Sequence, residues 1–205
     1  MCDNCERLLA PTGPRCVRCD LPLAVEGVCG ECLANPPAYD DVLSAFDYRF
    51  PIDRLVGRFK FSADLAAGAY LGRALAMRAK RAPRPDLLVA SPASAQRLRE
   101  RGFNPALVLA RAVGRELGIP VHGRALAKIR HTPPQAGLDR AARRRNLRGA
   151  IAVRGTFEDL HVAVVDDVMT TGSTLAAIAQ ALRGAGARRV SGWVAARTPE
   201  PPREE

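Results

Sequence analysis

A stretch near the C-terminus joins an apolar run to two acids and a loop of small hydroxyl residues. Residues 162–165 are all apolar, Asp166 and Asp167 follow, and a loop leads directly into apolar residues at helical spacing, Leu175, Ile178, Ala179 and Leu182. This order predicts a buried strand that ends at residue 165, a turn, and an amphipathic helix. The chain should therefore contain an α/β domain whose ligands meet the carboxyl ends of its strands.

The loop has the composition of a site for a phosphorylated sugar. Its residues are Thr170, Thr171, Gly172, Ser173 and Thr174. The amides at a helix N-terminus, the hydroxyl groups and a glycine that allows close backbone approach together favour phosphate oxygens. The two preceding carboxylates would repel a phosphate unless they met sugar hydroxyls or a hydrated Mg²⁺.

Strand and helix patterns alternate along most of the chain. We expect strands at 42–48, 87–90, 119–121, 150–153, 161–165 and 190–195, and helices at 63–81, 106–117 and 173–183. Such alternation predicts a mostly parallel sheet flanked by helices. We place this domain at 41–197, after a cysteine-rich module at 1–38 and before a disordered tail at 198–205 that is rich in proline and glutamate.

All six cysteines lie within the first 32 residues, as three C-x-x-C pairs. Two such pairs provide the four thiolates of a structural Zn²⁺ site. We favour the set Cys16, Cys19, Cys29 and Cys32, because nine residues separate the two pairs and glycines allow the turns. Cys2 and Cys5 are then surplus, although a site made by that pair with Cys29 and Cys32 is the alternative. Metal binding would supply the folding energy of so short a module.

The net charge of +10 is unevenly distributed. Residues 80–154 carry 17 basic and 4 acidic side chains, a local surplus of 13 positive charges. Such a field attracts polyphosphates or nucleic acid, although a solvated basic surface is the simpler interpretation. Neither a membrane span nor a signal peptide is expected, so we predict a cytoplasmic protein without membrane contact.

The segment from residue 162 resembles the phosphoribosyl-pyrophosphate (PRPP) signature of the type I phosphoribosyltransferases. The resemblance implies a type I phosphoribosyltransferase-like fold. It also implies that Asp166 and Asp167 bind the ribose hydroxyls, that the loop binds the 5′-phosphate, and that PRPP binds together with Mg²⁺. Two competing phosphate-binding motifs fit poorly, because the sequence has no G-x-x-x-x-G-K-S/T and no G-x-G-x-x-G that follows a strand.

Further motifs make the chain similar to the ComF family of competence-associated phosphoribosyltransferase-like proteins. These are the paired cysteines, Phe59-Lys60-Phe61, the stretch 91–104 and the stretch from Arg130 to Ala150, which occur in the family's order. The resemblance implies an N-terminal zinc ribbon and a role in DNA uptake. It also implies that single-stranded DNA and uptake proteins such as a helicase are candidate partners.

Three cations are candidate ligands of the pyrophosphate group. Arg97 and Arg101 follow the strand at 87–90, whose loop binds pyrophosphate in type I enzymes, and their spacing puts them on one face if the segment is helical. Lys60 lies between two phenylalanines that would bury its stem and direct its ammonium into a cleft. The alternatives are solvated arginines and an ordinary lysine on an amphipathic helix.

The segment around 130–150 combines prolines with arginines. Thr132 and Gln135 lie in a proline-interrupted loop that could close over PRPP as a flap and exclude water. Arg140 and Arg144 suit nucleic-acid phosphates, and a solvated helix face explains them nearly as well.

Three functions agree with these features, and the sequence identifies no catalytic residue. The first is transfer of a phosphoribosyl group from PRPP to an unknown acceptor. The second is a non-catalytic module that binds single-stranded nucleic acid, which the low aromatic content of 5% disfavours. The third is a PRPP sensor that regulates a partner of the uptake machinery.

Overall fold

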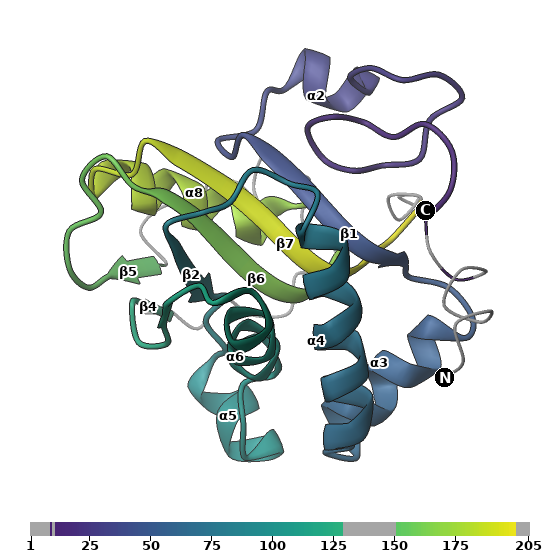
Figure 1. Cartoon of the computed structure of the whole chain (residues 1–205). Coiled ribbons are helices and arrows are strands. Elements are labelled where there is room, and N and C mark those ends of the chain that lie inside the picture. Colours follow the sequence, from purple (N-terminus) through teal and green to yellow (C-terminus); the bar gives the residue numbers. More distant parts are fainter. Residues whose placement is uncertain (1–8, 10, 129–150, 200–205) are drawn as a thin grey trace.

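A five-stranded, all-parallel sheet forms the centre of the protein (Figure 1). The computed structural model describes residue 9 and residues 11–128 and 151–199. The strands are β1 (Asp41–Asp47), β2 (Leu87–Ala90), β3 (Val121–His122), β6 (His161–Met169) and β7 (Arg189–Arg197), in the order β1-β7-β6-β2-β3. The central strands β6 and β7 are almost entirely buried, as expected of a parallel sheet covered on both faces.

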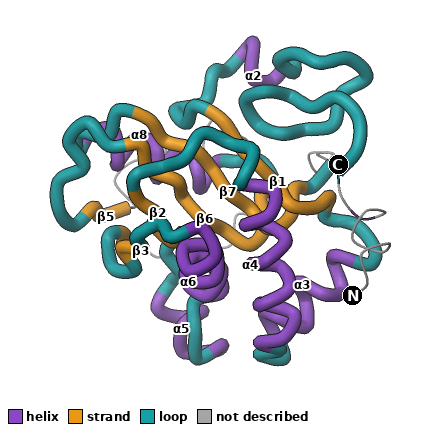
Figure 2. Tube along the Cα trace, viewed as in Figure 1, coloured by secondary structure: helices purple, strands orange, loops and turns teal. Residues whose placement is uncertain are grey.

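Helices cover both faces of this sheet, which confirms the predicted fold class. Helices α4 (Leu65–Ala79) and α6 (Pro105–Leu117) pack together on one face, and α3 (Ile52–Phe61) packs against α4. Helix α8 (Ser173–Gly184) lies on the other face, where its apolar side chains join a second buried cluster. In its described part the cysteine-rich segment is mostly loop, contains the short helix α2 (Gly30–Ala34) and lies beside β1 (Figure 2).

Buried polar contacts join the cysteine-rich segment to strand β1. Arg15 pairs with Asp20 at 2.9 Å and with Asp47 at 3.0 Å. The amide of Ser44, on the outer edge of β1, donates to the Asp20 carboxylate at 2.8 Å. An edge strand leaves such amides unpaired, so the segment covers an otherwise exposed sheet edge.

Besides the short α2, two helices were not among those expected from the sequence. The first is α3, in the region preceding the predicted 63–81 helix. The second is α5 (Ala95–Arg101), which follows β2 and has no buried residue. A helix with no apolar face gives no hydrophobic periodicity, so only its cap, the Ser94 hydroxyl that accepts from the Arg97 amide at 3.3 Å, marks its start.

Several predicted boundaries shift for local reasons. The helix expected from residue 63 begins at Leu65, because the Asp64 carboxylate caps it by accepting from the Ala67 amide at 3.0 Å. The strand expected at 119–121 is β3 at Val121–His122, because the Ile119 amide donates to Gly114 O and closes α6.

A small antiparallel pair stands apart from the main sheet. Strand β5 (Ile151–Val153) was expected, but it pairs with β4 (Leu126–Lys128), which was not. At the C-terminal end, where the tail was predicted to begin, Thr198 still donates its amide to Met169 O at 3.0 Å, and residues 200–205 lie outside the described part. Within the described ranges, none of the helices has the length and apolarity that a membrane crossing requires.

Candidate functional site

The acid pair and the hydroxyl loop lie where β6 leads into α8, at the carboxyl edge of the sheet. Strand β6 continues past Asp166 and Asp167 to Met169, because this stretch still pairs with β7, as in Asp166 with Val194. The predicted strand end at residue 165 was therefore wrong. The acids belong to a rigid strand rather than to the loop, and both are half-buried.

Gly172 makes the turn into α8. It is the N-cap residue of the helix and has the left-handed conformation, with φ of 76°. A Cβ atom at this position would lie 2.6 Å from Met169 Cε and 2.9 Å from the Tyr39 hydroxyl. Both the backbone angle and the available space therefore require glycine.

The backbone amides of the loop find few acceptors in the described part of the chain. Among the described residues, no acceptor receives the amides of Thr171, Gly172 or Thr174, and the Ser173 amide reaches Thr171 Oγ1 only at 3.4 Å. The loop residues line a pocket of about 50 Å³ that also includes Asp166. Open amides at the start of a 12-residue helix, together with its dipole, form a place for an anion.

Asp166 is held in an environment that disfavours its charge. Burial, and then the charge of the neighbouring Asp167, raise the pKa of Asp166 to about 7. Hydrogen bonds from the Asp167 amide, at 2.8 Å, and from Ser91 act in the opposite direction. Near neutral pH this carboxyl can therefore lose its proton. The carboxylate can then accept a hydrogen bond from a ligand hydroxyl or bind a cation.

Lys60, in the last turn of α3, points into the site. Its Nζ lies 2.9 Å from Asp167 Oδ1, and the exposed fractions of the two side chains are 17% and 14%. The flanking aromatics differ, because Phe59 is buried whereas Phe61 is 76% exposed. Lys60 is thus both a helix lysine and a cation at the acid pair.

The predicted arginines lie on α5, after the loop that follows β2. Arg97 is exposed, and the Arg101 guanidinium lies 4.9 Å above the centre of the Phe61 ring. Within the described ranges, no acid pairs with either arginine. Burial, and then the charge of Arg97, lower the pKa of Lys128. The geometry therefore connects α5 to the acid pair through Arg101, whose ring contact is with the residue that follows Lys60.

Some predicted site residues lie outside the described part of the chain. They are Thr132, Gln135, Arg140 and Arg144 of the proposed flap and nucleic-acid segment, and Cys2 and Cys5 of the first cysteine pair.

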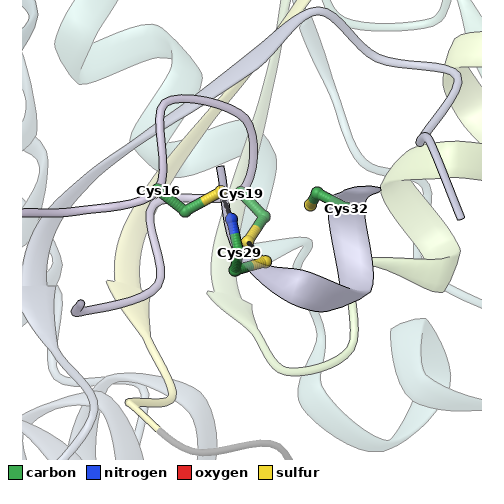
Figure 3. A group of neighbouring side chains, drawn as sticks. All are labelled: Cys16, Cys19, Cys29 and Cys32. Atoms are coloured by element: carbon green, nitrogen blue, oxygen red, sulfur yellow. Dashed lines mark hydrogen bonds between the residues drawn. The ribbon is translucent and has the colours of Figure 1, made fainter. Parts of the chain in front are cut away.

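The four favoured cysteines converge (Figure 3). The sulfur atoms of Cys16, Cys19, Cys29 and Cys32 all lie within 4.8 Å of one another, and all four residues are buried. Zinc–sulfur bonds of about 2.3 Å in a tetrahedron would place the sulfurs about 3.8 Å apart. The cluster therefore has the size and donor set of a Zn²⁺ site.

Burial and close approach shift the pKa values of the thiols, and a bound dication would offset the repulsion between their ionised forms. Burial, and then the charge of Cys16, raise the pKa of Cys19 to about 11, and burial with charged neighbours raises that of Cys32 further. For Cys16 burial also acts upward, but amide hydrogen bonds, first from Cys29, outweigh it and lower the pKa to about 7. Four thiolates this close need a compensating cation.

Two residues that the sequence did not single out join the cysteine cluster to the loop. Arg197, at the end of β7, donates to carbonyl groups on both sides, and Tyr39 is buried between them. An arginine and a tyrosine surrounded by unremarkable sequence give no motif, and their partners are distant along the chain.

The comparisons with known proteins agree with this geometry. The model of the phosphoribosyl transferase domain family matches residues 104–205. The DNA utilization protein YhgH of Salmonella typhi is 35% identical over 205 residues, which cover 97% of this chain and 90% of that protein. Competence protein F of Haemophilus influenzae is 32% identical, with 96% and 90% covered.

Among solved structures, a glutamine PRPP amidotransferase from B. subtilis is 25% identical over 62% of this chain and 26% of that chain, with a TM-score of 0.44. The parallel sheet, the flanking helices and the matched domain define a protein with a type I phosphoribosyltransferase fold and an N-terminal cysteine cluster. Within that class, the chain belongs to the ComF family, which includes competence protein F and DNA utilization protein YhgH.

Proposed function

We propose that the β6–α8 loop binds PRPP together with Mg²⁺. The open amides and hydroxyls of 170–174 receive the 5′-phosphate, and Asp166 and Asp167 receive the ribose hydroxyls. Lys60 and the α5 arginines Arg97 and Arg101 face the pyrophosphate, whose charge Mg²⁺ shares.

One observation carries this proposal: the loop amides are open while two half-buried acids stand beside them. A bare phosphate would satisfy the amides but would be repelled by the acids. A ligand that carries phosphate and neighbouring hydroxyls satisfies both. Lys60 supports it further, because its contact with Asp167 puts a cation within reach of the same ligand.

Calorimetric titration of PRPP, with and without Mg²⁺, tests the proposal. We expect binding to the wild type and a loss of at least about 100-fold in affinity in the Asp166→Asn/Asp167→Asn variant, because each charged hydrogen bond contributes about 1.5–3 kcal/mol. The matched control is Asp53→Asn/Asp159→Asn, which changes two acids away from the loop. Equal affinity in the acid-pair variant and this control would contradict the proposal.

Transfer of the phosphoribosyl group is the reaction that such a complex supports. The lone pair of an acceptor forms a bond to C1 of the ribose, the bond from C1 to the pyrophosphate oxygen breaks, and the acceptor proton passes to solvent. The cations near the leaving group stabilise the charge that develops on pyrophosphate. Release of labelled pyrophosphate in the presence of candidate acceptors tests this step, and binding without release would favour the PRPP-sensing role.

We also propose that Cys16, Cys19, Cys29 and Cys32 bind a structural Zn²⁺. The buried set of four sulfurs within 4.8 Å of one another supports this assignment. All four are free thiols, which suits the reducing cytoplasm that we expect for this protein.

Binding of single-stranded nucleic acid is a second candidate function, favoured by a specific contact. Phe61 exposes 76% of its surface while Arg101 covers one face of its ring at 4.9 Å. An exposed ring beside arginines can stack a base while the cations contact its phosphates. The names of the relatives, which refer to DNA utilization and competence, point in the same direction, and an uptake helicase is the partner such a role implies.

Fluorescence anisotropy with labelled oligothymidine at several salt concentrations tests this role. We expect Phe61→Ala to weaken binding about tenfold, since stacking contributes about 1–3 kcal/mol per base. Phe50→Ala is the control, because Phe50 is 78% exposed and, among the described residues, no cation lies over its ring. Equal losses in both variants would exclude a specific platform at Phe61.

A further inference from the structure

We infer that Arg197 is a positioning residue that ties the PRPP loop to the cysteine cluster, so that metal and PRPP each strengthen the binding of the other. The inference rests on the proposed function, because it concerns the same loop. It adds a role for the cysteine-rich segment beyond covering the edge of the sheet.

The contacts of Arg197 reach both regions at once. Its Nε donates to the Cys19 carbonyl at 3.0 Å, and Cys19 is one of the four converging cysteines. Its Nη1 donates to Thr170 O at 2.6 Å and to Met169 O at 3.3 Å, at the start of the loop. A fourth carbonyl, Thr198 O, also accepts from Nη1, at 2.7 Å.

The surroundings of Arg197 leave its guanidinium little freedom to move. The residue is 4% exposed, and within the described ranges no carboxylate pairs with it. A buried charge without an acid must be solvated by the oxygen dipoles around it. Loss of one carbonyl from this set is therefore unfavourable, which holds the Cys19 and Thr170 carbonyls at a fixed separation.

A second contact joins the same two regions. Tyr39 is 4% exposed and belongs to the buried cluster that contains all four cysteines, Met169 and Leu175. Its hydroxyl lies 2.9 Å from the position where a Cβ would stand on Gly172. Thr170 and Gly172, on either side of Thr171, are thus both supported from the cysteine side.

The shape of the cysteine segment depends on what holds its four sulfurs. The segment is short and its helix α2 has only five residues, so a bound metal is its main source of order. Without metal the Cys19 carbonyl loses its fixed place, Arg197 loses one of its acceptors, and the loop carbonyls that share the guanidinium are less well fixed. Thermodynamic linkage makes the effect reciprocal: the factor by which zinc tightens PRPP binding equals the factor by which PRPP tightens zinc binding.

Amide hydrogen exchange of the full-length wild type tests the tie without using PRPP. We expect the amides of Ala176 and Thr198, which donate to Gly172 O at 2.9 Å and to Met169 O at 3.0 Å at the two ends of the loop, to exchange about tenfold faster after zinc is removed with a chelator, while those of α6, on the other face of the sheet, keep their rates. Unchanged exchange at these two amides would overturn the inference, whether or not the protein binds PRPP.

Calorimetry then measures the linkage. PRPP with Mg²⁺ should bind about tenfold more tightly to the zinc-loaded protein than to the metal-free protein, and competition with a chromophoric chelator should give the same factor for zinc with and without PRPP. Absence of PRPP binding to both the zinc-loaded and the metal-free protein would count against the proposed function. The exchange result would then decide alone whether Arg197 links the loop to the cysteine cluster. PRPP binding of equal strength in both states would overturn the linkage.

Substitutions of Arg197 test whether its guanidinium carries the coupling between zinc and PRPP binding. Arg197→Met should reduce the coupling factor to near one, and Arg197→Lys, which keeps the charge but has fewer directed donors, should retain part of it. The control is Arg18→Met, because Arg18 also joins the cysteine segment to the main domain, through Asp40 O at 3.1 Å, without touching the loop. A control that loses the coupling as fully as Arg197→Met would show that general docking, not Arg197, carries it.

Discussion

The two candidate binding regions, the cysteine cluster and the β6–α8 loop, are built in opposite ways. The loop is held between a nine-residue strand and a 12-residue helix, so its geometry exists before a ligand arrives. In its described part the cysteine segment has little regular structure, and four buried sulfurs lie at its centre, where the pKa values of Cys19 and Cys32 are raised. One region is therefore preorganised for its ligand, whereas the other should acquire its order from its ligand.

Removal of two metal ligands should give the largest effect. It tests most directly whether the cysteine segment acquires its order from zinc. In Cys16→Ser/Cys19→Ser we expect zinc to be lost and the cysteine segment to unfold, because zinc contributes about 10–16 kcal/mol in small zinc modules. The main sheet should keep its circular dichroism. Zinc content by atomic absorption and the melting temperature measure the two effects.

The matched variant Cys2→Ser/Cys5→Ser separates the two pairings that the sequence leaves open. It should retain one equivalent of zinc with unchanged affinity. Retention in the Cys16/Cys19 variant together with loss in the Cys2/Cys5 variant would instead establish the rival site.

The dependence of stability on the ionisation of Asp166 tests whether the preorganised site has an energetic cost. Its pKa is raised to about 7 in the folded protein, against about 3.9 in an unfolded chain. Between these values the folded state retains a proton that the unfolded state has lost, so stability falls as pH rises toward 7 and the penalty is constant above it.

Asp166→Asn removes this penalty. Its advantage in unfolding free energy over the wild type should grow by about 2 kcal/mol between pH 5 and pH 8, as measured by urea denaturation. In the wild type, PRPP affinity should rise through the same window as the carboxyl ionises. An advantage that stays constant with pH would mean that the carboxyl is not held in its neutral form.

A methyl group at Gly172 tests the rigidity of the loop itself. Gly172→Ala should lower the unfolding free energy by about 1–2 kcal/mol, because the left-handed φ of 76° disfavours a side chain and the added Cβ would meet Met169 and Tyr39. The control Gly57→Ala, in a helix with open space around it, should raise stability by about 0.5–1 kcal/mol. Thermal denaturation measures both, and a neutral Gly172→Ala would indicate a loop that adapts freely.

The preorganised part of the site was also the part that the sequence revealed. The acids and the hydroxyl loop are consecutive, so one motif contains them, and regular elements on either side fix their positions. The end of β6 was misplaced because pairing with β7 continues through Met169, which no local pattern indicates. The fold class followed from alternation, but α5 did not, because it buries nothing.

The long-range parts of the site could not be derived from the sequence. The contact of Lys60 with Asp167 joins residues of α3 and β6, and its aromatic neighbours gave only a hint of it. Arg197 uses main-chain carbonyls as partners, and every residue has a carbonyl, so no pattern of residue types could indicate which ones it would meet.

Arg97 should give the smallest effect and shows how far the site extends beyond its rigid part. It is exposed on a helix without buried residues, so Arg97→Ala should change the unfolding free energy by less than about 0.5 kcal/mol. Its contribution is electrostatic: PRPP affinity should fall a few-fold, and the effect should shrink as salt screens the charge. Arg111→Ala, an exposed arginine on α6, is the control and should leave PRPP affinity unchanged. Equal losses in the two variants would mean that total charge, rather than the position of Arg97 on α5, attracts the ligand.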